Sequence, residues 1–353
     1  MGKFGLGIDI GGTFTDIVLY DGAARIQFSH KQLTTPEDPT EGVMTGIARL
    51  LRGARIDPGA VFRVVHATTL FTNALIERRG AKAGLITTAG FRDVLEIGRE
   101  RKYQLYDITI QKPVPLIPRH LRAEVPERMD VSGAVVVPLD EDALVETARG
   151  LIAKGVTSLA IVFLHSYANP AHELRAITVL AKAFPGIALS ASVDVAPEIR
   201  EYERTSTTAC NAYIKRLAER YLGRLTERLK GAGISADLLM MLSNGGLTTV
   251  TEASRVPVQL LESGPAAGAL AAAFLAAGDG GAHVLAVDMG GTTAKLSVND
   301  HGGPNLTYSF EAARATRFIE GSGLPLRIAT LELIEIGAGG GSIAGIDEIG
   351  LLK

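Results

Sequence analysis

Two glycine-rich loops hold most of the residues in this chain whose types and spacing suit chemistry. Residues 9–16 read Asp-Ile-Gly-Gly-Thr-Phe-Thr-Asp, and residues 288–295 read Asp-Met-Gly-Gly-Thr-Thr-Ala-Lys. Adjacent glycines permit unusual backbone conformations and let a phosphate approach the amides closely, threonine hydroxyls add donors, and an aspartate can hold a hydrated magnesium ion. Each loop therefore predicts a phosphate-binding turn, and the pair predicts a clamp on one triphosphate.

A glycine turn in a plain hairpin would explain either loop alone, but the recurrence of the same groups in the same order favours a duplicated nucleotide-binding core. Asp9 and Asp288, which precede the two glycine turns, are predicted to be catalytic and to bind Mg²⁺. The other loop residues predicted to contact the nucleotide are Gly11, Gly12, Thr13, Thr15, Asp16, Gly290, Gly291, Thr292 and Thr293.

The elements that position these loops follow an α/β pattern. Short β-rich runs at 4–9, 14–20 and 25–33 predict an antiparallel opening, and helix-like and strand-like runs then alternate up to residue 88 and again after residue 134. Four prolines between residues 103 and 130 disfavour regular elements and predict an excursion over the surface. The longest helical pattern covers 206–233, and its Cys210 is predicted to be a small buried thiol.

A second helix, predicted over 262–278, leads into the second loop. Its residues Gly264, Ala267 and Gly268 leave one face bare enough for another helix to cross closely, which predicts a hinge. Gly264 is also predicted to contact the nucleotide.

Composition excludes several classes of protein. The 353 residues suffice for two domains, and a net charge of −2 offers no basic field for nucleic acid or for an anionic membrane. The most apolar run, at 266–278, is too short to span a bilayer. One cysteine excludes an intrachain disulfide, and the first residues lack the pattern of a signal peptide, so we expect a cytoplasmic protein with no membrane or nucleic-acid partner.

Together these loops and the small-residue helix resemble the superfamily of sugar kinases, actin and seventy-kilodalton heat-shock ATPases. The resemblance implies an α/β fold of duplicated ribonuclease-H-like (actin-like ATPase) domains with mixed sheets that close over ATP. It would place the first domain at 1–261 with an inserted subdomain around 103–200, a connecting helix at 262–278, and an incomplete second domain at 279–353.

Within that superfamily the chain resembles the A-type subunits of the hydantoinase/oxoprolinase family. The motifs that carry this resemblance run almost from end to end: GIDIGGTFTD, HATTLFTNALIERRG, EYERTSTTACNAYI, SNGG, ESGPAAG, DMGGTTAK and EIGAGGGSIAGIDE. The resemblance implies ATP-dependent opening of a cyclic amide, with Mg²⁺, through transfer of the γ-phosphoryl group to the ring carbonyl. It covers about half of a typical member, so a B-type subunit or a missing C-terminal segment is expected as partner.

Other functions remain open at this point. An acetone-carboxylase-like subunit is the nearest alternative, and a chaperone-like ATPase or a sugar kinase would share the two loops. A dehydrogenase is a weak alternative, because Gly339, Gly341 and Ala344 only partly match a dinucleotide fingerprint. His66 is compatible with a core position or a substrate contact, and Lys295 with a phosphate contact or a solvent-facing position.

Overall fold

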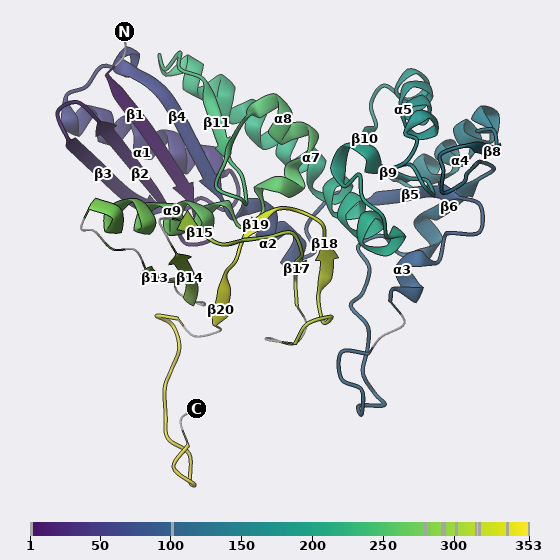
Figure 1. The fold of residues 1–353 in the computed structure, drawn as a ribbon. Coiled ribbons are helices and arrows are strands. Elements are labelled where there is room, and N and C mark those ends of the chain that lie inside the picture. Colours follow the sequence, from purple (N-terminus) through teal and green to yellow (C-terminus); the bar gives the residue numbers. More distant parts are fainter. Residues whose placement is uncertain are drawn as a thin grey trace.

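The structure, a computed structural model, describes residues 3–99, 102–278, 281, 283–290, 294–300, 303–314, 316, 319–336 and 339–351. A six-stranded sheet with the strand order β12-β11-β4-β1-β2-β3 lies at one side of the molecule (Figure 1). The first three strands form an antiparallel meander, whereas β4 runs parallel to β1 and β11 runs parallel to β4. The strands are β1 (Phe4–Ile10), β2 (Phe14–Asp21), β3 (Ile26–Leu33), β4 (Val61–Thr68), β11 (Leu238–Met241) and β12 (Leu247–Thr249).

Alternation along β1 explains how this sheet finds its core. Leu6, Ile8 and Ile10 are buried, whereas the residues between them are only half-buried, as expected for side chains that point to opposite faces of a strand. Helix α1 (Pro39–Ala54) packs against β2 and β3. It begins where the Asp38 carboxylate accepts a hydrogen bond from the Thr40 amide at 3.1 Å, a normal N-terminal cap.

A second sheet is parallel throughout, with the order β10-β9-β5-β6. Its strands are β5 (Ala83–Thr88), β6 (Arg122–Val125), β9 (Ser158–Val162) and β10 (Ala188–Ala191). Helices α4 (Glu141–Ala153) and α5 (Ala171–Ala183) pack on it and on each other. The long helix α7 (Glu201–Gly231) contacts α1 and α2 (Leu70–Ile76) as well as three strands of this sheet. It lies between the two sheets (Figure 1).

The expectation of an irregular excursion over residues 103–130 is wrong for its last third. Strand β6 and the short hairpin of β7 (Arg128–Met129) and β8 (Val135–Val137) begin there. Pro118 and Pro126 flank β6 without entering it. In the part of the chain that the structure describes, β6 is an edge strand that pairs with β5 alone, a position that tolerates nearby prolines.

Helix α9 (Ser263–Gly278) matches the predicted second helix and leads into the third sheet, where β13 (His283–Met289) pairs with β14 (Ala294–Asp300). Strands β15 (Gly303–Pro304) and β20 (Ile334–Ile336) also pair with β14. The remaining elements are α2 (Leu70–Ile76), α3 (Val94–Ile97), α6 (Ser192–Val195), α8 (Val250–Arg255), β16 (Leu306–Thr307), β17 (Phe310–Ala312), β18 (Leu324–Leu326), β19 (Thr330–Leu331) and the 3₁₀ turns η1 (Pro58–Ala60), η2 (Arg119–Leu121) and η3 (Pro257–Leu260).

The expected close crossing of a helix over the small-residue face of α9 is not found among the described residues. The main contacts of α9 are with strands β4, β11, β13, β14 and β15. Gly268 is exposed, and a Cβ placed there would meet no atom within 4 Å. This glycine therefore makes no close contact of the kind expected of a packed hinge.

Candidate active site

The first loop is the tight connection between β1 and β2. The Gly11 amide donates to the Phe14 carbonyl at 2.9 Å, and Asp9 lies opposite Asp16 in the strand register. Neither glycine has the left-handed backbone expected of it. Close packing explains the glycine at position 11 better, because a Cβ there would lie 3.2 Å from the Phe14 carbonyl oxygen.

The two threonines of this loop differ in exposure. Thr13 is exposed, whereas Thr15 is buried and its hydroxyl lies 3.0 Å from that of Thr34. Because the Thr34 hydroxyl donates to the Gly11 carbonyl at 2.9 Å, the Thr15 hydroxyl must supply the proton between the two threonines. Thr15 thus stabilises the loop through Thr34, whereas Thr13 is exposed to solvent. No sequence pattern pointed to Thr34, which comes from the end of β3.

Asp9 occupies an unusual position for a carboxylate. Burial, and after it repulsion from Asp16 and Asp288, raises its pKa from the usual 3.8 to about 6, although Lys31 acts in the opposite direction. Its Oδ1 is buried and has no hydrogen-bond partner among the described residues. A buried, unpaired carboxylate oxygen is costly to a protein and is common at sites that bind a cation or move charge.

The first turn of α9 closes the site over Asp9. A Cβ built on Gly264 would lie 3.1 Å from Asp9 Oδ1 and 3.5 Å from Oδ2, a contact so tight that the Asp9 carboxylate would have to shift to admit a side chain. The preceding Ser263 joins α9 to the end of β4, since its hydroxyl accepts from the Thr68 amide at 3.1 Å. Asp9 and Gly264, predicted from separate motifs, therefore lie together.

Asp16 is less available than Asp9. Lys31 lies opposite it on β3, and its ammonium group donates to both carboxylate oxygens of Asp16 at 2.9 and 2.8 Å. This exposed pair places a positive charge beside the loop. Sequence reasoning did not single out Lys31, because only the strand register brings it to this edge.

The second loop follows β13, where the exposed Asp288 lies opposite Lys295 in the register. Gly291, Thr292 and Thr293 lie outside the described residues. The Gly290 carbonyl accepts a hydrogen bond from the Gly340 amide at 3.0 Å. The glycine run near residue 340 thus belongs beside the second loop, and it forms a turn after β20.

Lys295 does not point freely to solvent, which was one of its two expected positions. Its ammonium group forms an ion pair with Glu262, and both side chains are largely buried. Glu262 immediately precedes α9 and has a left-handed backbone, with φ of 59°. The ion pair ties the second loop strand to the start of α9.

His66 is a core residue. Its ring is fully buried, with Nδ1 3.2 Å from the Ile8 carbonyl and Nε2 2.7 Å from the Tyr221 hydroxyl. Burial lowers the pKa of His66 to about 4, so the ring is neutral at pH 7. Both nitrogens are occupied within the fold.

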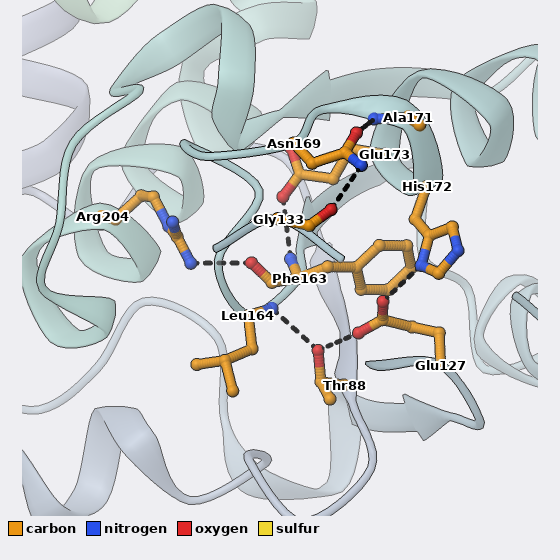
Figure 2. Close-up of polar contacts among 10 residues, drawn as sticks. All are labelled: Thr88, Glu127, Gly133, Phe163, Leu164, Asn169, Ala171, His172, Glu173 and Arg204. Carbon is orange, nitrogen blue, oxygen red and sulfur yellow. Dashed lines mark hydrogen bonds and ion pairs between the residues drawn. The ribbon is translucent and has the colours of Figure 1, made fainter. Parts of the chain in front are cut away.

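A second group of polar side chains lies where the strands of the parallel sheet end (Figure 2). Glu127 accepts from the Thr88 hydroxyl and lies 2.7 Å from His172 Nδ1, while Glu173 accepts from the Phe163 amide at 2.7 Å. Such edges often bind ligands, but here the buried carboxylates are engaged by the protein itself. Burial nevertheless raises the pKa of Glu173 against these hydrogen bonds.

No helix in the described ranges is both long and apolar enough to cross a membrane. No cluster of three or more histidine, cysteine, aspartate or glutamate side chains suited to a metal occurs in that part of the chain either. An all-protein metal cage is thus not found among the described residues. A site completed by phosphate oxygens and water needs fewer protein ligands.

The mixed sheets, the paired loops and the helix against Asp9 define an α/β protein with an actin-like ATPase type of fold. Two family models match the chain: the hydantoinase/oxoprolinase N-terminal region over residues 5–184, and hydantoinase/oxoprolinase over residues 204–353. The chain belongs to the hydantoinase/oxoprolinase family.

Its relatives have more than one activity. An uncharacterised protein of Methanocaldococcus jannaschii is 41% identical over 99% of this chain and 52% of its own length. The caprolactamase subunit alpha of Pseudomonas jessenii is 34% identical over 99% of this chain and 50% of its own, and other relatives are named 5-oxoprolinase.

Solved structures agree with these relatives. The ATP-dependent caprolactamase from Pseudomonas jessenii superposes with a TM-score of 0.84 at 33% identity, over 98% of this chain and 49% of that one. Nucleotide-free acetone carboxylase superposes with a TM-score of 0.81 at 27% identity, over 100% of this chain and 51% of that one. The chain thus spans about half the length of the Methanocaldococcus jannaschii protein, the caprolactamase subunit and the acetone carboxylase chain.

Proposed function

We propose that this chain forms the phosphate-binding part of an enzyme that uses ATP to open a cyclic amide of the hydantoin or 5-oxoproline type. The observation that carries the proposal is the position of Asp9. Its carboxylate has a buried oxygen without a partner among the described residues and lies against Gly264. Repulsion from Asp288 on the other loop contributes to its raised pKa. Three motifs far apart in the sequence therefore converge on one point. Relatives named caprolactamase and 5-oxoprolinase support the choice of reaction.

The residues present fit a magnesium ion, because Asp9 has an unpaired buried oxygen and no basic side chain bonded to it. Asp9 and Asp288 would hold the ion, which neutralises charge on the phosphates during phosphoryl transfer. Gly11, Gly12 and Thr13 would contact the phosphates from the first loop. The second loop would contribute Gly290 together with Gly291, Thr292 and Thr293.

ATP is needed because a ring amide is a poor electrophile. In the proposed reaction the amide carbonyl oxygen attacks the γ-phosphorus and ADP leaves. Water then adds to the activated carbon, the ring nitrogen departs as the C–N bond breaks, and the resulting acyl phosphate is hydrolysed by a second water to the ring-opened acid and phosphate. The chain's own part is to orient the phosphates between its two loops and to present the Asp9 carboxylate beside them. The carboxylase alternative would activate a ketone by the same transfer and rests on the similarity to acetone carboxylase.

An incomplete second domain is part of the proposal. On β13, Leu285, Val287 and Met289 share one face and are 61%, 59% and 61% exposed, and Phe274 of α9 is 78% exposed. Apolar surface of this extent on neighbouring elements marks an interface. We infer that residues 279–353 begin a domain that a further segment or a B-type subunit completes, after a first domain at 1–261 with an insertion near 103–200 and a connecting helix at 262–278.

ATP as substrate and the buried, unpaired Cys210 favour a cytoplasmic enzyme. The proposal is tested by ATP hydrolysis measured on the completed enzyme with hydantoin, 5-oxoproline or caprolactam, and separately with acetone plus bicarbonate. Amide-dependent release of ADP together with a ring-opened product supports it. Stimulation by acetone and bicarbonate alone would support the carboxylase instead, whereas stimulation by unfolded peptides or by a hexose would indicate a chaperone or a sugar kinase.

A further inference from the structure

A cavity of about 530 Å³ opens where three distant segments of the chain meet. These segments are the residues after α3, the first turn of α7, and the residue after β18; α7 contacts both other elements. The side chains that line the cavity are those of Arg99, Arg200, Glu201, Tyr202, Glu203 and Arg327. Its volume suits a small molecule, and no described residue of the two phosphate loops is among those that line it.

The cavity holds three guanidinium groups and two carboxylates, and these charges are not all neutralised in pairs. Arg99 forms an ion pair with the buried Glu203. Among the described residues, the ion-pair contact of Arg327 is a long one, 3.9 Å, with Glu198 outside the cavity lining. Arg200 has no ion-pair partner in the part of the chain that the structure describes. Two arginines are therefore available to a ligand.

The backbone adds to this positive character. Helix α7 is 31 residues long and starts at the cavity, and Arg200 at its N-terminus provides no side-chain cap. The first amides of a helix lack partners within the helix, and the aligned peptide dipoles favour an anion there. Arginine side chains that converge on such an end match the geometry of carboxylate and phosphate groups.

We propose that this cavity is a binding site for a small oxyanion, either a carboxylate or a phosphate group, held by Arg200, Arg327 and the first amides of α7. Glu201, the lining carboxylate without an ion pair in the described residues, lies where it can accept a hydrogen bond from a ligand that carries an N–H group beside its oxyanion. The site is separate from the phosphate loops, so it binds its ligand without nucleotide.

The test is isothermal titration calorimetry on the whole chain without ATP. The probes are 5-oxoproline, its neutral analogue 2-pyrrolidinone, and inorganic phosphate. We expect 5-oxoproline or phosphate to bind and 2-pyrrolidinone not to bind; which of the two binds identifies the source of the oxyanion. Arg327→Gln and Arg200→Gln should each weaken binding about tenfold or more, as expected when a charge-assisted hydrogen bond is lost.

Three matched variants complete the design. Arg200→Lys keeps the charge and should bind better than Arg200→Gln. Arg149→Gln removes an exposed arginine of α4 that pairs with Glu146, so it should bind as the wild type does. Asp9→Asn alters the phosphate loops and should also leave binding unchanged, whatever its effect on ATP turnover. Thermal melting by circular dichroism shows which variants are folded.

Specific results would overturn the proposal. Equal binding of 2-pyrrolidinone and 5-oxoproline would exclude oxyanion recognition. Unchanged affinity in folded Arg200→Gln and Arg327→Gln would exclude this cavity. Loss of binding in Asp9→Asn with no loss in the arginine variants would assign the signal to the phosphate loops.

Discussion

At the scale of single residues, the electrostatics of the site centre on Asp9. Its pKa of about 6 results first from burial and then from the nearby Asp16 and Asp288. The ionised Asp9 carboxylate destabilises the folded state, and the same carboxylate is proposed to face the phosphates and their magnesium ion. Stability and function are therefore expected to oppose each other at this residue.

The first prediction concerns the stability of the nucleotide-free chain. Because the pKa of Asp9 is higher in the folded state than its usual 3.8, the folded state binds the proton more tightly, and stability falls as the pH rises from about 4 to about 6. Asp9→Asn removes this penalty, so it should raise the free energy of unfolding at pH 7 by on the order of 1–3 kcal/mol. Urea unfolding at pH 7 and at pH 3.5 measures the effect, which should vanish at the lower pH.

Asp93→Asn is a suitable control for that experiment. The Asp93 carboxylate is exposed and its pKa is lowered by its hydrogen bonds with Arg119, so its replacement should give no gain at pH 7. If Asp9→Asn left the free energy of unfolding at pH 7 unchanged or lowered it, the ionised Asp9 carboxylate would not destabilise the folded state.

The second prediction concerns turnover in the completed enzyme. Asp9→Asn and Asp288→Asn should each lower ATP turnover by on the order of a hundredfold or more, because each removes a charge that orients the metal or the phosphates. Steady-state release of ADP in the presence of the amide substrate measures it. Normal turnover in either variant would remove that residue from the proposed site.

The third prediction uses Cys210, which is fully buried in α7, where burial raises the pKa of its thiol to about 12. Only a thiolate reacts readily with iodoacetamide, so the folded chain should resist alkylation at pH 8 and react once urea unfolds it. Mass spectrometry after a timed pulse of reagent reports the reaction. Rapid labelling without denaturant would contradict the buried position.

At the scale of elements, α9 carries two glycines with different surroundings. Gly264 lies so close to the Asp9 carboxylate that a side chain there would displace it, whereas the position of Gly268 is open. The helix is therefore constrained at its first turn, where it meets the site, and free one turn later.

The fourth prediction follows from that contrast. Gly264→Ala should reduce ATP turnover of the completed enzyme by about tenfold or more, because the new methyl group displaces Asp9 from its position. Gly268→Ala is the matched control. It should leave turnover unchanged and raise the free energy of unfolding by about 0.5–1 kcal/mol, the usual gain for alanine over glycine in an exposed helix. Equal effects of the two substitutions would contradict the assigned role of Gly264.

The ion pair between Lys295 and Glu262 is a second device at the scale of elements. It connects β14 with the residue before α9, so the second loop and the helix that closes over Asp9 are held together. Both partners are largely buried, and removal of one would leave the other charged and unpaired. The arrangement explains how the charge of Lys295 is accommodated in a largely buried position.

At the scale of the whole molecule, the first two sheets are covered by helices, whereas the third sheet has exposed apolar side chains on one face. The first two sheets share one buried core through α7. Strand β13 pairs only with β14 among the described residues, and its outer apolar side chains remain exposed. The chain also spans about half the length of its relatives from Methanocaldococcus jannaschii and Pseudomonas jessenii.

The fifth prediction is therefore that this chain alone binds ATP weakly and with little preference for adenine over guanine. In the proposed site the loops that it contributes would contact phosphates, whereas the contacts that distinguish the base would come from the completing segment or subunit. Isothermal titration calorimetry with ATP and GTP measures the preference. Addition of that segment should produce tight, adenine-selective binding, and tight selective binding by the chain alone would place the base site within these residues.

The amino-acid sequence alone predicted the two glycine hairpins, the α/β order and the helix at 262–278, and it supplied Asp9 as a candidate residue of the proposed site. These features depend on local spacing, which needs no knowledge of distant contacts. It also supported two positions for His66, and only the fold showed that Ile8 and Tyr221 occupy both ring nitrogens.

Tertiary structure decided which distant residues meet. The register of β2 with β3 brings Lys31 to Asp16, the end of β3 brings Thr34 under the first loop, and the turn before α9 brings Glu262 to Lys295. It also placed Gly264 against Asp9 and left Gly268 open, although the two glycines look alike in the sequence. The physical reason is that charge pairing and close packing depend on distances through space, which sequence separation does not encode.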